Sequence, residues 1–393
     1  MAERAYITAK VFKWARESAK ITEDAAASNV AVSVDRFKEW ETGESYPTIK
    51  QAQKLAKVYK RPFAVLFLPE IPNDFHPLQD FRKKGSKELS TSSIFIIREI
   101  QQKQAWISEL NEDDEENAAQ FVGRFSFNDS PVKVARDILN TLEINPLDYK
   151  TNNPLLEWIH RAEKKGIFIS RAGSIHSKLK LVVDEIQGFA IADKYAPFVF
   201  INSRDWKSPQ LFTLVHELAH LWIAETGVSN KIEASIKSSK DYHPIESFCN
   251  EVAANALILE EFITSFEDNI FDNAKDIFKK AKSIGVSSFA LLVRALNLNV
   301  ISLSVYKKLK EQADYEYNEF IKREEKKKAK QKEQKKDTPL YYPLIVNRNG
   351  ILFIQTALDA YRAGFIDPAY ASSLLSVKVN NFSKLEKQIY KWI

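Results

Sequence analysis

Two histidines and a glutamate lie close together near the middle of the chain, in the order His216-Glu217-Leu218-Ala219-His220. Residues four apart share one face of a helix, so both imidazoles can reach a single metal ion. Glu217 lies beside them, where its carboxylate can take a proton from water. The spacing therefore predicts hydrolytic chemistry at a zinc ion, with Glu217 as the general base.

The same motif can arise by chance, as two histidines on the solvated face of a helix. The chain has only six histidines, so two at ligand spacing are a less probable coincidence. Apolar residues surround the motif over 211–222, which predicts a buried helix that begins with Ser208 as its N-cap and Pro209 in its first turn. A polar trio on a buried helix is costly unless a metal ion pairs with it.

A third ligand is expected from the next helix, which Pro244 begins. Glu246 is the first choice, because it stands beside a run too apolar for a free surface, and Glu251 is the alternative. Two histidines and one glutamate leave a fourth coordination position open, which is typical of a catalytic rather than a structural zinc site.

The spacing of Glu246 and Asn250 resembles that of thermolysin-type enzymes. In those enzymes the third ligand is a glutamate on a following helix, and a residue four positions later orients the first histidine. The resemblance implies that Glu246 binds the metal and that Asn250 orients His216. Cys249 is expected in the core. A structural role in the loop is expected for Tyr242 and His243, with stabilisation of an oxyanion as the alternative.

Three stretches carry a closer resemblance: Phe212-Thr213-Leu214-Val215-His216-Glu217-Leu218-Ala219-His220-Leu221, the run from Gly188 to Asn202, and Glu246-x-x-Cys249-Asn250-x-x-Ala253-Ala254. Together they are similar to the ImmA/IrrE metallopeptidases over roughly 155–265. Cys249 and Val252 depart from the family's pattern, and its usual Met-Pro is missing at Ile258-Leu259-Glu260. The resemblance implies a zinc peptidase fold and, in several relatives, site-specific cleavage of a helix-turn-helix repressor.

Residues 1–70 are expected to form short helices. Thr22 and Ser33 have the N-cap residue types that predict two helices near 22–28 and 33–41, packed through Ala26, Val30, Val34 and Phe37. The run Trp40-Glu41-Thr42-Gly43-Glu44, followed by Pro47-Thr48, resembles the end of the recognition helix in Xre/Cro-type helix-turn-helix domains. The resemblance implies that the second helix enters the major groove of operator DNA.

Four polar or basic residues are the expected DNA contacts: Ser33, Arg36, Lys38 and Lys50. Residues 1–70 contain 12 Lys/Arg and 9 Asp/Glu, which is a weak electrostatic footprint for DNA. A helical bundle that binds no DNA is therefore the alternative.

The length of 393 residues predicts two to three structural units. We expect a mostly helical α+β protein: a helix-turn-helix bundle, a zincin-like metallopeptidase domain with a small sheet, and a small C-terminal helical unit. Strands are expected at 166–169, 188–191 and 198–201, the last of which could accept an extended peptide by edge addition. The expected domains are 1–70 (helix-turn-helix), 71–150 (helical connection), 151–310 (peptidase), 311–340 (charged basic helix or linker) and 341–393 (C-terminal domain).

The composition is that of a globular protein, with 45% hydrophobic and 28% charged residues. No stretch is apolar enough to span a bilayer, the N-terminus lacks the apolar core of a signal peptide, and the single cysteine excludes an intramolecular disulfide. These features predict a cytoplasmic protein without a membrane partner.

The net charge of +5 is concentrated at 321–336, which is expected to be a solvated helix or linker, with phosphate contacts as the alternative.

The order of the parts predicts a DNA-binding regulator whose zinc-dependent metallopeptidase domain cleaves a specific protein, namely a repressor, a toxin partner or the chain itself. The alternative is a non-catalytic regulator or antitoxin that uses the peptidase fold to bind a partner. A homodimer is expected by analogy with Xre-like domains.

Overall fold

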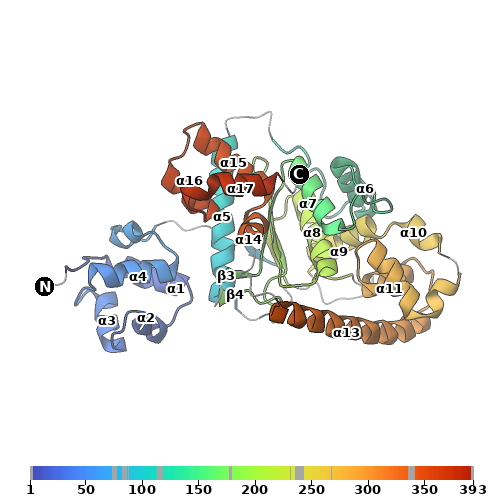
Figure 1. The fold of residues 1–393 in the computed structure, drawn as a ribbon, viewed down its shortest axis with the longest axis horizontal. Helices are drawn as coiled ribbons and strands as arrows, with labels where there is room; N and C mark the ends of the chain where they lie inside the picture. The colour runs from blue at the N-terminus through green and yellow to red at the C-terminus, as the bar shows by residue number, and fades with distance from the viewer. Residues whose placement is uncertain are drawn as a thin grey trace. The chain divides into compact units, whose positions relative to one another are not determined.

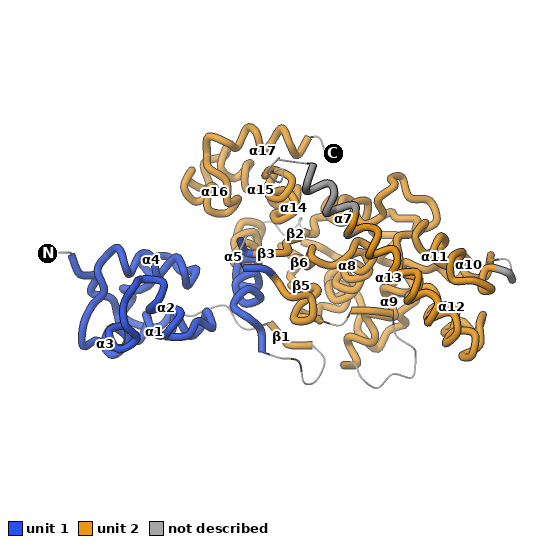
Figure 2. Tube along the Cα trace, turned by 60° about the horizontal axis from the view of Figure 1, so that its bottom comes forward, with its two compact units in different colours: residues 1–77, 87–101, 175–180 blue, residues 78–86, 102–174, 181–393 orange. Residues whose placement is uncertain are grey.

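The computed structural model describes residues 3–72, 78–81, 86, 88–112, 118–176, 179–230, 232–234, 243–266, 268–334 and 341–390. Contacts divide the chain into two compact units (Figure 2). The first comprises residues 1–77, 87–101 and 175–180, and the second comprises residues 78–86, 102–174 and 181–393. The division passes through a long helix, so the predicted domain boundaries stay predictions.

The first unit contains a bundle of short helices: α1 (Ala9–Ser18), α2 (Glu23–Asn29), α3 (Val34–Thr42), α4 (Ile49–Tyr59) and the 3-10 helix η1 (Phe63–Phe67). Thr22 and Ser33 cap α2 and α3 as predicted, each accepting a backbone N–H from its helix. Gly43 ends α3 with φ +84°, a left-handed conformation that glycine adopts without strain. Local capping therefore sets the start of both helices and the end of α3.

The core of this bundle includes Ala26, Val30 and Phe37, as expected, and Val34 packs against it from a partly buried position. A buried ion pair ties α1 to α3: Arg16 Nε donates to Glu41 Oε1 at 2.7 Å, and Arg16 Nη2 donates to Glu41 Oε2 at 2.9 Å. The two bonds fix how α3 packs on α1, because a guanidinium and a carboxylate pair in one plane.

The helices outside this bundle are α5 (Thr91–Asn111, shared by the two units), α6 (Pro131–Leu142), α7 (Pro154–Lys164), α8 (Lys207–Trp222), α9 (Pro244–Leu257), α10 (Glu260–Thr264), η3 (Asp268–Asp272), α11 (Ala274–Ser283), α12 (Ser288–Asn297), α13 (Leu303–Gln334), α14 (Tyr341–Asn349), α15 (Ile351–Arg362), α16 (Pro368–Leu375), η4 (Val379–Asn381) and α17 (Phe382–Ile389) (Figure 1). The predicted class, a mostly helical α+β protein with a small sheet, is confirmed.

The main sheet has the strand order β1-β7-β5-β6-β2. Its strands are β1 (Gln79–Asp80), β2 (Phe168–Ala172), β5 (Gly188–Ile191), β6 (Phe198–Asn202) and β7 (Gly227–Ser229), and a separate pair is formed by β3 (Ser174–His176) and β4 (Leu179–Lys180). β5 and β6 pair antiparallel. β2 pairs parallel with β6, and β1 pairs parallel with β7.

The expectation that strand 198–201 accepts an added peptide is wrong. β6 is an interior strand, because β5 occupies one side of it and β2 occupies the other. Its backbone groups are therefore already paired within the sheet. The outer strands of the sheet are β1 and β2.

Of the two helices that carry the site, α8 packs directly on this sheet. α8 packs against β5 and β6, and α9 packs against α8 and α6 (Figure 1). Every side chain from Gln210 to Trp222 is buried, so the predicted burial of the motif helix is confirmed. A helix that is buried on all sides is expected to be mostly apolar, and outside the motif the buried polar residues of α8 are Gln210 and Thr213.

Residues 341–390 lie in the same compact unit as the sheet. α14 packs beside β2, where Ser170 Oγ donates to the carbonyl of Arg348 at 2.5 Å. Gly350 has φ +81°, and a Cβ there would lie 2.4 Å from the carbonyl oxygen of Ile169. The C-terminal helices therefore close the β2 side of the sheet.

Residues 321–334 belong to α13, which agrees with the expected charged helix, and 335–336 lie outside the described residues. None of the helices in the described part of the chain is both long and apolar enough to cross a membrane.

Candidate metal centre

The motif helix α8 begins earlier than its sequence suggests. Trp206, not Ser208, is the N-cap, because the first helical hydrogen bond runs from the Gln210 N–H to the Trp206 carbonyl at 3.0 Å. Pro209 still lies in the first turn, where a missing N–H costs nothing. His216 and His220 then follow on one face of the helix.

The structure brings His216, His220 and Glu246 together in a buried cluster. The two Nε2 atoms lie 3.2 Å apart. Glu246 Oε1 lies 3.1 Å from His220 Nε2, and Glu246 Oε2 lies 3.4 Å from His216 Nε2. Ligand-type atoms of three residues therefore face one point.

These separations fit a metal ion. Two ligands about 2.0–2.1 Å from one zinc ion, in tetrahedral arrangement, lie about 3.3 Å apart. The three separations of 3.1, 3.2 and 3.4 Å lie close to that value. A cation also relieves the repulsion of lone pairs that would otherwise face one another in a buried site.

The hydrogen bond of His216 to Asn250 leaves the other ring nitrogen of His216 directed at the cluster. Its Nδ1 donates to Asn250 Oδ1 at 3.0 Å, because an amide oxygen can only accept. In the neutral ring, Nε2 then carries a lone pair directed at the cluster. Burial lowers the pKa of His220, which favours the neutral form of that ring.

Ser229 is a residue of the site that sequence reasoning missed. Its hydroxyl, on β7, donates to Glu246 Oε1 at 3.1 Å and holds that carboxylate toward the histidines. A serine within a short strand gives no signal by itself. The interaction exists because the sheet and α9 meet at this point.

Glu217 is fully buried, and neither of its carboxylate oxygens has a hydrogen-bond partner in the described part of the chain. Burial raises the pKa of Glu217 well above its ordinary value, the charge of Glu246 raises it further, and the nearby Ser229 hydroxyl lowers it. Burying a carboxylate without a hydrogen-bond partner costs free energy. We therefore expect a bound group, such as a metal ion or a water molecule, to interact with Glu217. A nearby cation would favour the ionised form that a general base needs.

Gly188 gives Glu217 its space. A Cβ at Gly188, the first residue of β5, would lie 2.9 Å from Glu217 Oε1 and 2.7 Å from Thr213 Cγ2. This glycine begins the run to Asn202 that resembles the ImmA/IrrE metallopeptidases. Its physical reason is the close passage of α8 over the sheet.

The other sequence-derived candidates do not join the cluster. Glu251, the alternative ligand, is outside it and is only partly buried. Cys249 is buried in the core as expected, where burial raises the pKa of its thiol. His243 is the N-cap of α9 and accepts the Ile245 N–H, and Tyr242 lies outside the described residues.

The part of the chain that contains the buried cluster also matches a known protein family. Residues 162–296 match the family model of the IrrE N-terminal-like domain, Peptidase_M78. The matched segment contains Glu217, Asn250 and the whole buried cluster. The match supports a zincin-like metallopeptidase fold for this IrrE-like segment. A comparison with curated proteins found no match to the chain.

The four candidate DNA contacts lie in the first unit, outside the IrrE-like segment. Ser33 uses its hydroxyl to cap α3, accepting the Arg36 N–H at 3.2 Å. Arg36 forms an ion pair with Glu39, and Lys38 Nζ lies 3.5 Å from Glu23 Oε2. Lys50 is exposed on α4. These local ion pairs reduce the positive charge that α3 presents.

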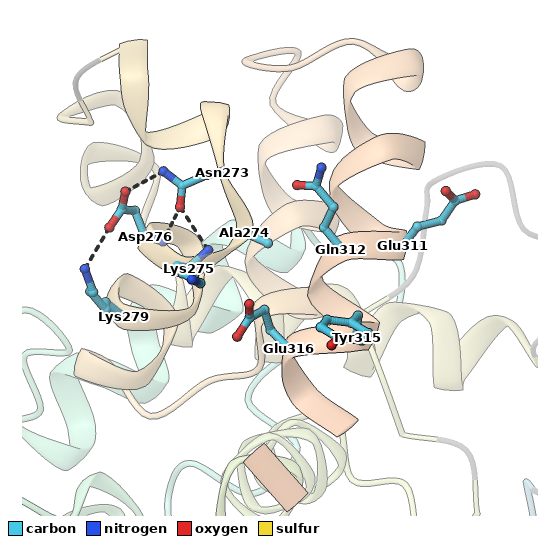
Figure 3. A pocket seen from close by; sticks show the side chains of 9 residues that line it. All are labelled: Asn273, Ala274, Lys275, Asp276, Lys279, Glu311, Gln312, Tyr315 and Glu316. Carbon is cyan, nitrogen blue, oxygen red and sulfur yellow. Dashed lines mark hydrogen bonds and ion pairs between the residues drawn. The ribbon is translucent and has the colours of Figure 1, made fainter. Parts of the chain in front are cut away.

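A surface pocket lies between α11 and α13, outside the candidate metal centre (Figure 3). Its walls carry polar side chains such as Asp276, Lys279 and Glu316. Asp276 is already engaged there, accepting from Asn273 Nδ2 at 2.7 Å and from Lys279 Nζ at 3.0 Å. No residue of the metal-type cluster lines this pocket.

Proposed function

We propose that this chain is a zinc-dependent metallo-endopeptidase that cleaves a specific protein and acts as a DNA-binding regulator. One observation carries the proposal: His216, His220 and Glu246 converge on one point, and the unpaired carboxylate of Glu217 lies beside them. The family match of the IrrE-like segment supports the same chemistry.

His216, His220 and Glu246 would hold the zinc ion, with Asn250 and Ser229 fixing the orientation of His216 and Glu246. When bound, zinc would supply a Lewis acid that polarises a peptide carbonyl and lowers the pKa of a water molecule. Glu217 takes the proton of the attacking water and delivers it to the leaving amine. Burial of the whole set keeps bulk water away and strengthens these interactions.

The proposed substrate is a protein: a repressor, a toxin partner or the chain itself. Metal removal tests this. Cells that produce the wild-type chain are expected to contain a fragment of the substrate, and the purified zinc-loaded chain is expected to reproduce that fragment in vitro. Dialysis against a chelator should stop cleavage, and one equivalent of zinc should restore it. A fragment that forms equally well in the chelator would contradict the proposal.

The alternative is a regulator or antitoxin that binds its partner through the same fold without cutting it. In that case the purified chain would bind zinc and its partner, and the partner would stay intact over long incubation. Gel electrophoresis and mass spectrometry of the mixture distinguish the two functions.

The proposed DNA contacts are tested with a duplex selected by the full chain from a random library. Replacing Arg36, Lys38 and Lys50 together with alanine is expected to weaken binding. Each lost phosphate contact should reduce the slope of log K against log salt by about 1. A charge-matched control replaces exposed Lys378, Lys384 and Lys387. Equal binding by the two triple variants would contradict the proposed surface, and the same titrations report whether the chain binds as a dimer.

A further inference from the structure

One outer edge of the sheet is formed by a very short segment of the chain. β1 pairs parallel with β7, with Gln79 opposite Gly227 and Asp80 opposite Val228. The next residue continues the contact, since the Phe81 N–H donates to the Val228 carbonyl at 3.1 Å. Both side chains of β1 are exposed, so the strand gains backbone pairing but almost no burial. Phe81, at the end of this strand, is buried.

The ring of Phe81 lies on the candidate metal centre. It stacks on the imidazole of His220, with 5.4 Å between ring centroids and 13° between planes. It also contacts His243, at 5.4 Å and 36°. Only 3% of Phe81 is exposed, although it adjoins a strand whose side chains face solvent. The ring therefore covers one face of a candidate ligand.

Gly227 leaves the space that Phe81 fills. A Cβ at Gly227 would lie 2.3 Å from two carbon atoms of the Phe81 ring and 2.8 Å from the carbonyl oxygen of Gln79. Gly227 does not have a positive φ, so its backbone conformation does not require glycine. The lack of a side chain is needed because an extended chain with an aromatic residue passes there.

β7 connects this edge to the cluster. Gly227 and Val228 pair with β1, and Ser229 donates to Glu246 Oε1 at 3.1 Å. Any extended chain that pairs with β7 therefore lies next to Glu246 and His220. At the opposite side of the sheet the C-terminal helices already pack on β2. An added strand can thus reach the metal centre along β7.

We propose that the β7 edge is a binding site for an extended peptide with an aromatic side chain, and that Leu78–Phe81 occupies this site in cis and holds it closed. The inference rests on the proposed function, because it assigns the peptide-binding strip of the same centre. A tethered segment of this kind acts at an effective concentration of about a millimolar, so it competes strongly with free peptides. Its small contact with the sheet lets a partner that contacts more of the chain displace it.

The test uses the full chain and a fluorescein-labelled peptide that copies residues 76–83, with binding measured by fluorescence anisotropy. The wild-type chain is expected to bind this peptide poorly, since its own segment fills the site. Phe81→Ala should vacate the aromatic space and bind the peptide at least about tenfold more tightly. The double variant Phe81→Ala/Gly227→Ala should not bind it, because the new Cβ takes the place of the ring.

A second readout follows metal access. The rate at which a chromogenic chelator removes zinc is expected to rise in Phe81→Ala and in Gly227→Ala, because each uncovers His220 by a different route. Phe81→Tyr, which keeps the stacked ring, and Phe127→Ala, which removes a ring that is 45% exposed elsewhere, should leave the rate unchanged. Gly227→Ala keeps the test available if Phe81→Ala does not fold.

The outcomes separate this inference from the proposed function. If Phe81→Ala holds zinc but binds the peptide no better than wild type, the cis occupancy is wrong and the metal centre stands. If the wild-type chain holds no zinc, the proposed peptidase fails, while the anisotropy measurement still reports whether the β7 edge binds peptide. If zinc is removed from Gly227→Ala at the wild-type rate or more slowly, the proposal that Leu78–Phe81 covers the β7 edge also fails.

Discussion

Replacing Glu246 with alanine is expected to remove the bound metal ion, whereas the same replacement at Glu251 is expected to leave metal content unchanged. The two residues lie on the same helix and carry the same charge. Only Glu246 faces both imidazoles, and it is 3% exposed. Its loss removes a ligand and also the negative charge that balances the cation, so the remaining histidines bind much more weakly.

Metal content is measured on the purified chain by atomic emission, with circular dichroism as the control for folding. The wild-type chain and Glu251→Ala should each hold about one zinc ion, as expected for a single mononuclear site. Asn250→Ala should give an intermediate result, with affinity reduced about 10–100-fold because His216 loses its orienting partner. Stoichiometric zinc in Glu246→Ala, or its loss in Glu251→Ala, would refute the assigned ligand set.

Glu217→Gln is expected to lower the rate of peptide cleavage by about 10²–10⁴-fold without changing zinc content. Glutamine has the shape of glutamate but cannot take a proton from water. Glu217 is outside the ligand cluster, and glutamine keeps the size of its side chain, so the substitution should leave the metal ligands in place. The change should therefore appear in turnover and not in metal affinity.

The measurement follows the substrate fragment over time and compares single-turnover rates of wild type and Glu217→Gln. Gly188→Ala is a second, positional variant, because its Cβ would press on the carboxylate without altering its chemistry. It should slow cleavage and retain zinc. Cleavage by Glu217→Gln at the wild-type rate would place the general base elsewhere. If repression in cells also persists unchanged in Glu217→Gln, the non-catalytic regulator becomes the better explanation.

Local sequence signals determined much of this protein. The spacing of His216 and His220 predicts a shared helical face because the helix has a fixed period. The residue types at Thr22, Ser33 and Gly43 predict the ends of α2 and α3, because capping involves only neighbouring residues. The apolar flanks of the motif predict a buried α8. Each of these inferences depends on interactions within a few residues.

Where a local signal failed, a neighbouring interaction took precedence. Ser208 has the residue type of an N-cap, but α8 begins at Lys207 and uses Trp206 instead. Asp205 and Gln210 stabilise that earlier start, since Gln210 Nε2 donates to the Asp205 carbonyl at 2.6 Å. The residue type of Ser208 is therefore not enough to place the start of α8, because contacts with neighbouring residues such as Asp205 also determine where the helix begins.

Only the tertiary structure decided which parts of the chain meet. The choice between Glu246 and Glu251 depends on how α9 packs on α8, and the interior position of β6 depends on its parallel pairing with the distant β2. Ser229 and Phe81 reach the centre from segments that carry no motif. The reason is physical: strand order and helix packing are set by contacts between residues far apart in the chain, and a single sequence records those contacts only as scattered apolar and small residues.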